Sequence, residues 1–433
     1  MAAVADRHDN FQLRFRPGIA DDWGLMVDAI GEQPVMVTAN QVARARSAFA
    51  AHLIGRPGFR IDPVPYRLES VLGWTEGRHG TKAAYQRLEA EFGHGLDFRL
   101  IGPRLRWADL STAVAHRYVD NVLRFQASYL LHETRESLRL FAPAAFMEVE
   151  RGLRPAALLA PYVLIDDRLA LSDQRALWRE TTQRWDDAPV ELVVAVEPSF
   201  MRNVVLMREL VEAVAATHHD VVWLWFVGES RLAGPSLADR VRAERRAVRA
   251  LSDVGKTVRL LHSGFFEMAL SYDGASETAF GMGMQSGRVK AGGGPELGLF
   301  YSLTLHRNVW YPDARSLLHR CRTAEDLANE LCACDMCIEA FSTSPGQYEA
   351  DFFAGAPLMR HGHLVLGQET ASRFSASLNR FHRLYVRSRE ALLIRAQSRR
   401  QLATALAATV MRMSRADTSS LHHAADALMP ESA

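Results

Sequence analysis

The segment LCACDMCIEAF (residues 331–341) carries three of the four cysteines in the chain, Cys332, Cys334 and Cys337. Three thiolates at this C-x-C-x-x-C spacing can surround one tetrahedral ion and leave its fourth position to another residue. An iron–sulfur cluster is the alternative, but such a cluster usually takes four cysteines, and Cys321 stands apart upstream. We therefore expect the segment to hold a structural zinc ion.

A histidine is expected to complete this metal site. His382 lies in LNRFHRLYVRSREALL, a helical pattern that could aim its side chain from a rigid backbone, whereas His361 and His363 lie in a loop-like segment. We select His382 as the fourth ligand and keep His363 as the alternative.

Carboxylates form a second candidate group, because four of them directly follow apolar segments. They are Asp62 in RIDP, Asp166 in LIDD, Glu197 in AVEP and Glu229 in FVGE. If these segments are parallel strands, their carboxyl ends meet on one face of the sheet, where an active site is expected. The alternative is that each acid caps a helix or forms a turn.

The elements that would position these residues are recurring strand-then-helix units. The expected strands are PVMVTAN (34–40), GFRIDPVPY (58–66), APYVLIDD (160–167), VELVVAVEPSF (190–200), DVVWLWFVGES (220–230) and KTVRLLHSG (256–264). Continuous apolar runs indicate strands that are buried on both faces, as in a parallel sheet. Repeated units without an obvious switch point favour an α/β fold of the (β/α)8 TIM-barrel type.

The chain is expected to divide into three parts. Residues 1–330 are predicted to form the barrel, 331–415 a zinc-binding helical subdomain and 416–433 a disordered tail. A hydrophobic fraction of 48% in 433 residues is sufficient for a large core. The sequence has no apolar run of membrane-spanning length and no signal-peptide pattern, so a cytoplasmic protein without membrane contact is expected.

Basic residues gather near the end of the chain, although the net charge is only +1. Residues 380–415 contain nine arginines and a single acid, Glu390. Arginine pairs bidentately with phosphate oxygens, so Arg395, Arg399 and Arg400 are predicted to bind nucleic acid. The alternative is a solvated helix face.

The cysteine cluster after a predicted barrel, followed by a histidine on a later helix, resembles the zinc subdomain of the tRNA-guanine transglycosylase superfamily. That superfamily includes the queuosine and archaeosine enzymes and a DNA-modifying branch that inserts 7-deazaguanines. The resemblance implies a pentosyltransferase that exchanges guanine for a 7-deazaguanine base in DNA or tRNA. It extends over roughly residues 58–395, and its specific part is the cysteine motif.

The resemblance also implies roles for individual residues. RIDP resembles the strand whose aspartate is the general acid/base, which assigns that role to Asp62. The segment LSYDGASETAFGMGMQSGR (270–288) stands where the family has its nucleophile and offers Asp273 and Glu277. The residues implied to recognise the base are Asp166, Glu197, Gly228 and Glu229.

Departures from the family motifs leave a second function open. The F-D-C segment that normally bears the nucleophile is absent, and the glycines expected after Asp62 are missing. The alternative is therefore a catalytically degenerate barrel that binds nucleic acid or a partner protein in a modification or defence system. Sequence alone leaves homodimerisation open as well.

Overall fold

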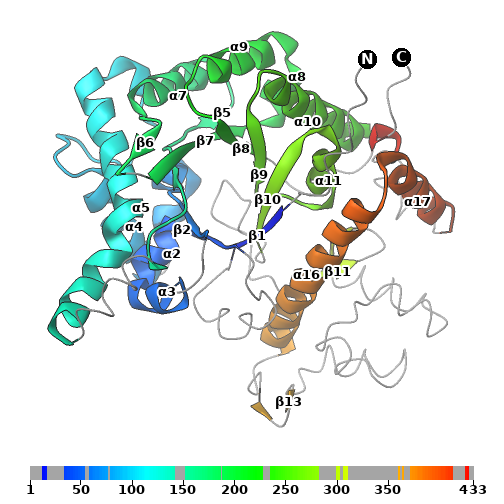
Figure 1. Ribbon diagram of the computed structural model, residues 1–433, viewed down its shortest axis with the longest axis horizontal. Coiled ribbons are helices and arrows are strands. Elements are labelled where there is room, and N and C mark those ends of the chain that lie inside the picture. Colours follow the sequence, from blue (N-terminus) through cyan, green and yellow to red (C-terminus); the bar gives the residue numbers. More distant parts are fainter. Residues whose placement is uncertain are drawn as a thin grey trace.

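The computed structural model (Figure 1) describes residues 12–16, 34–53, 58–76, 79–141, 152–186, 188–227, 235–281, 299–302, 306–310, 359–360, 363–364, 371–412 and 425–428. Within this part of the chain no helix combines the length and apolar character needed to cross a bilayer.

The centre of the fold is a large sheet with the strand order β1-β10-β9-β8-β7-β4, in which β5 and β6 also pair with β7. Its pairs are parallel except for the antiparallel pair of β6 with β7. The strands are β1 (Gln12–Arg16), β4 (Leu158–Leu159), β5 (Leu164–Ile165), β6 (Arg184–Trp185), β7 (Ala188–Val196), β8 (Val221–Phe226), β9 (Thr257–Leu261) and β10 (Ala275–Gly281). The predicted α/β fold built on a parallel sheet is confirmed.

The apolar runs explain why these strands are central. From Glu191 to Val196 every residue of β7 is buried, and so is Val222 to Phe226 in β8. Strands covered on both faces need apolar side chains in both directions, which alternating patterns do not supply.

A separate parallel pair, β2 (Met36–Thr38) and β3 (Arg60–Asp62), lies between β1 and β4. The Arg14 guanidinium of β1 donates to the Val35 carbonyl at 3.2 Å. On the other side, the Ala156 amide donates to the Phe59 carbonyl at 3.0 Å. Two short antiparallel hairpins follow later in the chain, β11 (Leu299–Ser302) with β12 (Arg307–Trp310) and β13 (Met359–Arg360) with β14 (His363–Leu364).

Helices cover the sheet, with α5 beside β4, α7 beside β5 and α10 beside β9 (Figure 1). The helices are α2 (Ala39–Arg44), α3 (Arg46–Leu53), α4 (His79–Phe92), α5 (Thr112–Phe141), α7 (Arg168–Glu180), α8 (Pro198–Arg202), α9 (Val204–Ala215), α10 (Pro235–Asp253), α11 (Phe265–Met268), α16 (Ala371–Ala396) and α17 (Arg399–Arg412). Short 3-10 turns include η2 (Pro65–Leu68), η3 (Ser70–Leu72), η4 (Trp74–Glu76), η5 (Trp107–Asp109) and η6 (Ala269–Asp273).

Within the predicted helical subdomain (331–415), residues 371–412 contain two helices, α16 and α17. Ser398 separates them, because its amide and hydroxyl both donate to the Gln401 side chain, at 2.7 and 2.9 Å. The Gln401 amide donates in return to the Ser398 hydroxyl at 3.3 Å, and this reciprocal capping starts α17 at Arg399. The S-x-x-Q spacing was therefore a readable signal for the break.

Helix α16 is attached to the rest of the fold through the buried carboxylate of Glu390. Tyr301 of β11 donates its hydroxyl hydrogen at 2.7 Å, His306 lies at 2.7 Å and Arg387 donates to the second oxygen at 2.7 Å. Burial would raise the pKa of Glu390, but the charges and hydrogen bonds of these partners outweigh it and hold the pKa below its ordinary value. The carboxylate thus joins α16 to the β11–β12 hairpin.

Within the segment predicted to be a disordered tail (416–433), the structure describes residues 425–428. Residues 425–428 form a helical turn in which Ala425, Ala427 and Leu428 are buried. The Ala427 carbonyl accepts a hydrogen bond from Arg245 of α10. Burial of these apolar side chains holds the turn in place. A short segment rich in alanine gives no pattern from which this burial could be predicted.

A buried acid on α10 predicts a pH-dependent stability. Burial raises the pKa of Glu244 to about 7, although Arg240 opposes the shift through an ion pair at 2.6 Å. Because the folded-state pKa lies above that of the unfolded chain, stability falls as the pH rises from about 4.5 to about 7. This single proton contributes a slope of at most about 1.4 kcal/mol per pH unit. Urea unfolding at several pH values should show that Glu244→Gln removes this component, whereas exposed Glu212→Gln leaves it; equal slopes in both variants would contradict it.

Candidate active site at the carboxyl end of the sheet

Asp62 is the last residue of β3, and its carboxylate is fully buried. One oxygen, Oδ1, accepts hydrogen bonds from the Val64 amide at 3.1 Å and from the Tyr162 hydroxyl at 2.9 Å. Tyr162 lies in the segment between β4 and β5, a hundred residues further along the chain. The fold therefore places the Tyr162 phenol against Asp62, the residue to which the family resemblance assigns general acid/base chemistry.

The other oxygen, Oδ2, faces His262, whose Nε2 atom lies 3.8 Å away. His262 directly follows β9, and its ring lies against the Trp225 ring of β8 with the centroids 4.7 Å apart. Both side chains are buried. Since Asp62 ends β3 and His262 directly follows β9, they mark the carboxyl end of the sheet.

Backbone strain accompanies this pair on both sides. Val64 has φ = 43° and His262 has φ = 61°, a left-handed conformation that residues with a side chain rarely adopt. Each such residue costs on the order of 1–3 kcal/mol, and strain of this kind concentrates at functional sites. At Val64 the unusual turn aims the backbone amide at Asp62.

A small pocket opens beside Asp62, and both Tyr66 and Tyr162 line it. Its far wall contains Trp107 and Tyr118, whose rings are stacked with centroids 4.2 Å apart. Burial raises the pKa of Tyr118, so its phenol stays neutral. Flat aromatic walls of this kind suit a planar ligand.

Charged groups line the same pocket. Arg104 donates to both oxygens of Asp166, at 2.8 and 3.0 Å, and to Glu69 at 3.2 Å. Burial raises the pKa of Glu69 more than the neighbouring Arg104 lowers it. Asp166 follows β5 and remains about one-third exposed, at 36%. The pocket therefore offers one desolvated carboxylate, Glu69, and Arg104 links it to the solvent-exposed carboxylate of Asp166 outside the lining.

Glu197 follows β7 beside this group. Its amide donates to the Ile165 carbonyl at 3.0 Å, and its side chain is half-buried at the start of α8. Asp62, Asp166 and Glu197 thus share the carboxyl end of the sheet, as expected from their positions after strands. Gly228 and Glu229 lie outside the described residues.

Asp273 lies at the opposite end. It precedes β10, and its buried carboxylate is held by Arg245 at 3.1 Å, Arg249 at 2.6 Å and Arg399 at 2.8 Å. An aspartate at the amino end of the sheet is far from Asp62. The nucleophilic role assigned to Asp273 stays a prediction, and this position favours a structural role instead.

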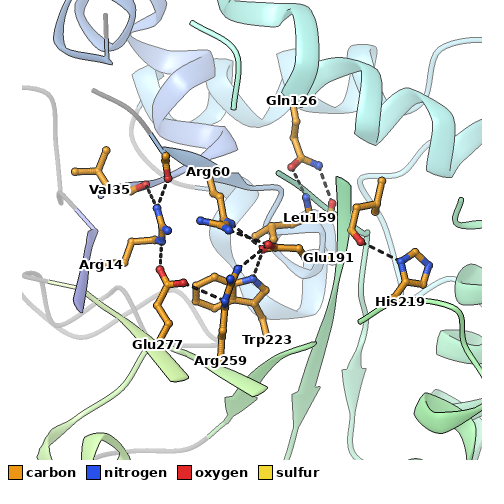
Figure 2. Close-up of polar contacts among 12 residues, drawn as sticks. Arg14, Val35, Arg60, Gln126, Leu159, Glu191, His219, Trp223, Arg259 and Glu277 are labelled. Atoms are coloured by element: carbon orange, nitrogen blue, oxygen red, sulfur yellow. Dashed lines mark hydrogen bonds and ion pairs between the residues drawn. The ribbon is translucent and has the colours of Figure 1, made fainter. Parts of the chain in front are cut away.

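Glu277 points into a buried charge network inside the sheet (Figure 2). Arg14 of β1 donates to it at 2.5 Å, and Arg259 of β9 lies at 3.0 Å. Burial, followed by the charge of Arg60, lowers the pKa of Arg14 to about 10, which leaves it protonated at neutral pH. Both carboxylate oxygens of Glu277 thus face guanidinium groups. The nucleophilic role of Glu277 likewise stays a prediction.

Glu191 of β7 is the second acid of this network (Figure 2). Arg60 donates to it at 2.7 and 2.8 Å, Arg259 at 2.6 Å and the Trp223 indole at 2.6 Å. Burial would raise the pKa of Glu191, but Arg60 and Arg259 outweigh burial and lower it. Sequence analysis missed this network, although a charged residue inside an otherwise apolar strand was its visible signal.

No protein-family model, curated protein or solved structure matches the chain. The resemblance to the transglycosylase superfamily consequently remains an interpretation of the sequence.

The three predicted nucleic-acid contacts lie around the turn between α16 and α17. Arg395 and Arg400 are exposed, whereas Arg399 is engaged by Asp273. The Tyr272 hydroxyl lies 2.9 Å from the Ile394 carbonyl and 3.0 Å from the Gln397 carbonyl, so this turn packs at the amino end of the sheet. Arg399 therefore has a structural partner, and the two exposed arginines stand at the end opposite Asp62.

The predicted zinc ligands Cys332, Cys334 and Cys337 lie outside the described residues. Of the two histidine candidates, His382 lies within α16 and His363 begins β14. Among the side chains that the structure describes, no group of three or more His, Cys, Asp or Glu residues is arranged to hold a metal. The zinc site stays a prediction that rests on the donor chemistry of the cysteine spacing.

Metal analysis tests this prediction with a control inside the chain. Purified protein should contain about one zinc ion per chain, and Cys332→Ala should lose it, because three thiolates are needed to complete the site. Cys321→Ala is the matched control and should retain zinc. Comparing His382→Ala with His363→Ala identifies the fourth ligand. Equal zinc content in the Cys332 and Cys321 variants, or iron in place of zinc, would contradict the assignment.

Proposed function

We propose that the chain is a transglycosylase-like enzyme that exchanges guanine for a 7-deazaguanine base in DNA or tRNA. The observation that carries this proposal is the buried Asp62 carboxylate at the carboxyl end of the sheet, hydrogen-bonded to a tyrosine that lines an aromatic and acidic pocket. Parallel α/β barrels place their reacting groups at this end.

The proposal includes a closed (β/α)8 barrel. Its support is that β2 and β3 lie between β1 and β4, the two ends of the main sheet. The Ala156–Phe59 hydrogen bond joins one side of this pair to the region of β4. In addition, Arg60 of β3 reaches Glu191 of β7 across the interior. A sheet that curls back on itself accounts for all these contacts.

The pocket suits a guanine-type base on chemical grounds. Such a base is planar and presents N–H donors along one edge, which a carboxylate accepts. Tyr66, Trp107 and Tyr118 supply flat apolar walls, and Glu69 supplies a desolvated acceptor. In this proposal Glu69 joins Asp166 and Glu197 as a residue that recognises the base, and Arg104 holds Glu69 and Asp166 in place.

A second function, base or nucleic-acid binding without exchange, is favoured by one specific observation. The carboxylates of Asp273 and Glu277 are buried and paired with arginines, so neither is poised to attack a sugar carbon. An enzyme of this type needs a nucleophile or an activated water in addition to its proton shuttle. The two functions differ in turnover and share the same pocket.

Base binding and base exchange measured together test the proposal. Wild-type protein should bind labelled guanine or 7-deazaguanine in equilibrium dialysis and should release labelled guanine from tRNA or DNA when the second base is added. Glu69→Gln should weaken base binding roughly 10- to 100-fold, because it loses a charged acceptor. Glu89→Gln is the matched control, since that glutamate pairs with the exposed Arg99 outside the pocket.

The outcomes separate the two functions. Binding with release of guanine supports the enzyme, and binding without release supports the binding protein. Wild-type protein that binds neither base, or a Glu69 variant that behaves as the Glu89 control does, would contradict the assignment of this pocket.

A further inference from the structure

We infer that Arg104 sets the specificity of the pocket, because it keeps the Glu69 carboxylate ionised and so makes it an acceptor for the N–H edge of a guanine-type base. Arg104 acts through Glu69 and is therefore a positioning residue. The inference deepens the proposed function, on which it rests for the identity of the ligand. Sequence analysis assigned no role to either residue.

The backbone holds Arg104 beside Glu69. The chain at Glu69 runs parallel to the chain at Gly102 in an isolated β-bridge. The Ser70 amide donates to the Gly102 carbonyl at 2.6 Å, and the Gly102 amide donates to the Leu68 carbonyl at 3.3 Å. This bridge brings Arg104, two residues beyond Gly102, to the wall of the pocket that Glu69 also lines.

One guanidinium group serves two carboxylates at this position. Arg104 donates through Nε to Glu69 at 3.2 Å and through Nη1 to both oxygens of Asp166, at 2.8 and 3.0 Å. The shorter contacts go to Asp166, whose side chain is 36% exposed, whereas the side chain of Glu69 is 10% exposed. The more deeply buried carboxylate thus has the longer contact with the shared positive charge.

The neighbouring titratable side chains have other partners or are neutral. Burial, followed by the charge of Glu69, raises the pKa of the Tyr118 phenol, which stays protonated. Arg67, on the turn before Glu69, donates to a side chain of α2 at 3.2 Å, and Arg106 pairs with a side chain of α7 at 2.8 Å. Arg104 is the cation that pairs with Glu69 at the pocket.

The two charges beside Glu69 act on its ionisation with opposite signs. Burial raises the pKa of Glu69, the charge and hydrogen bond of Arg104 lower it, and the charge of Asp166 raises it. Replacing Arg104 by a neutral side chain should therefore raise this pKa further, whereas neutralising Asp166 should lower it. A residue that only supported the shape of the pocket would not produce this pair of opposite shifts.

The charge of Glu69 decides which edge of a planar base it can bind. A guanine-type base presents its ring N–H beside its exocyclic amine, and an ionised carboxylate accepts from both donors. Adenine presents an acceptor ring nitrogen beside its amine, which suits a protonated carboxyl group that donates once and accepts once. By keeping Glu69 ionised, Arg104 favours guanine-type bases over adenine.

Nuclear magnetic resonance of carbon-13-labelled glutamate carboxyl groups tests the control of Glu69 without requiring any ligand. The Glu69 signal is assigned from its absence in Glu69→Gln. Its titration midpoint should rise by about one pH unit or more in Arg104→Gln and fall by about half a unit or more in Asp166→Asn. Arg104→Lys keeps the positive charge and should stay closer to wild type than Arg104→Gln does.

Arg99→Gln is the matched control for this titration. Arg99 is 76% exposed and pairs with Glu89 outside the pocket, so its loss should leave the Glu69 midpoint unchanged. A Glu69 midpoint that stays at the wild-type value in Arg104→Gln, or that moves in the same direction in Arg104→Gln and Asp166→Asn, would overturn the inference.

Equilibrium dialysis with labelled guanine and labelled adenine tests the specificity itself. Guanine binding to the wild type should weaken as the pH falls through the Glu69 midpoint, because the ionised carboxylate is the binding form. At a pH between the midpoints of the wild type and Arg104→Gln, the variant should lose about 10-fold or more of the preference for guanine over adenine. An undiminished preference would overturn the specificity role of Arg104.

The two experiments separate this inference from the proposed function. Opposite shifts of the Glu69 midpoint in a protein that binds neither base would support the control of Glu69 by Arg104 and contradict the proposed function. Base exchange in a protein whose Glu69 midpoint ignores Arg104 would support the proposed function and contradict this inference.

Discussion

Glu191→Ala is expected to lower the free energy of unfolding by roughly 3–5 kcal/mol, because it leaves Arg60 and Arg259 without the carboxylate that compensates them. Glu191 accepts four hydrogen bonds from Arg60, Arg259 and Trp223, and its side chain is only 6% exposed. The buried charge network contains three arginines and two glutamates, namely Arg14, Arg60, Arg259, Glu191 and Glu277. Losing one acid raises its excess positive charge from one to two in a largely buried site.

Urea unfolding followed by tryptophan fluorescence measures this effect. Glu212→Ala is the matched control, since Glu212 pairs with Arg208 on the surface with both side chains more than 60% exposed. That variant should lose no more than about 1 kcal/mol. Glu191→Gln keeps an acceptor of similar size and should fall between the two. A loss for Glu191→Ala no larger than for Glu212→Ala would show that the network does not hold the sheet together.

Asp62→Asn is expected to reduce base exchange by about 10²- to 10⁴-fold, the usual contribution of a positioned general acid or base. The substitution retains the size of the side chain and one oxygen that can accept from Tyr162 or Val64, but it removes the ability to take up a proton. Base binding should change little, because the pocket walls include Tyr66 and Glu69 and not Asp62. The expected loss therefore lies in kcat and not in KM.

Kinetics of exchange over a range of base concentrations check this expectation. Asp166→Asn is an informative comparison, because Asp166 pairs with Arg104, which lines the pocket, and should affect KM more than kcat. Thermal unfolding of both variants controls for folding. Turnover in Asp62→Asn within a few-fold of wild type would exclude Asp62 from the chemistry.

Sequence patterns predicted the strands well because burial on both faces leaves long apolar runs. The segments containing β7, β8 and β9 were located from such runs. The location of Asp62, Asp166 and Glu197 could be predicted from the strands as well. An acid at the end of a buried parallel strand lies at the carboxyl end of the sheet.

The partners of these residues could not be predicted, because they depend on which strands lie side by side. Tyr162 meets Asp62 across a hundred residues, and Arg60 meets Glu191 across 131. Trp223, Arg259 and Glu277 share one register position in three neighbouring strands, which sequence spacing does not encode. Asp273 was expected near the substrate because segment 270–288 stands where the resembled superfamily has its nucleophile, but β10 begins at Ala275, so Asp273 lies at the amino end of the sheet.

The α16–α17 turn packs at the amino end of the sheet, whereas the pocket lies at the carboxyl end. A nucleic acid that contacts both the turn and the pocket must therefore have a minimum length. A strand of nine residues such as β7 spans roughly 30 Å. A duplex rises about 3.4 Å per base pair, so reaching from the pocket to Arg395 and Arg400 takes roughly nine base pairs. Shorter oligonucleotides can engage only one end at a time, and affinity should then increase abruptly with length instead of rising in proportion to the number of phosphates.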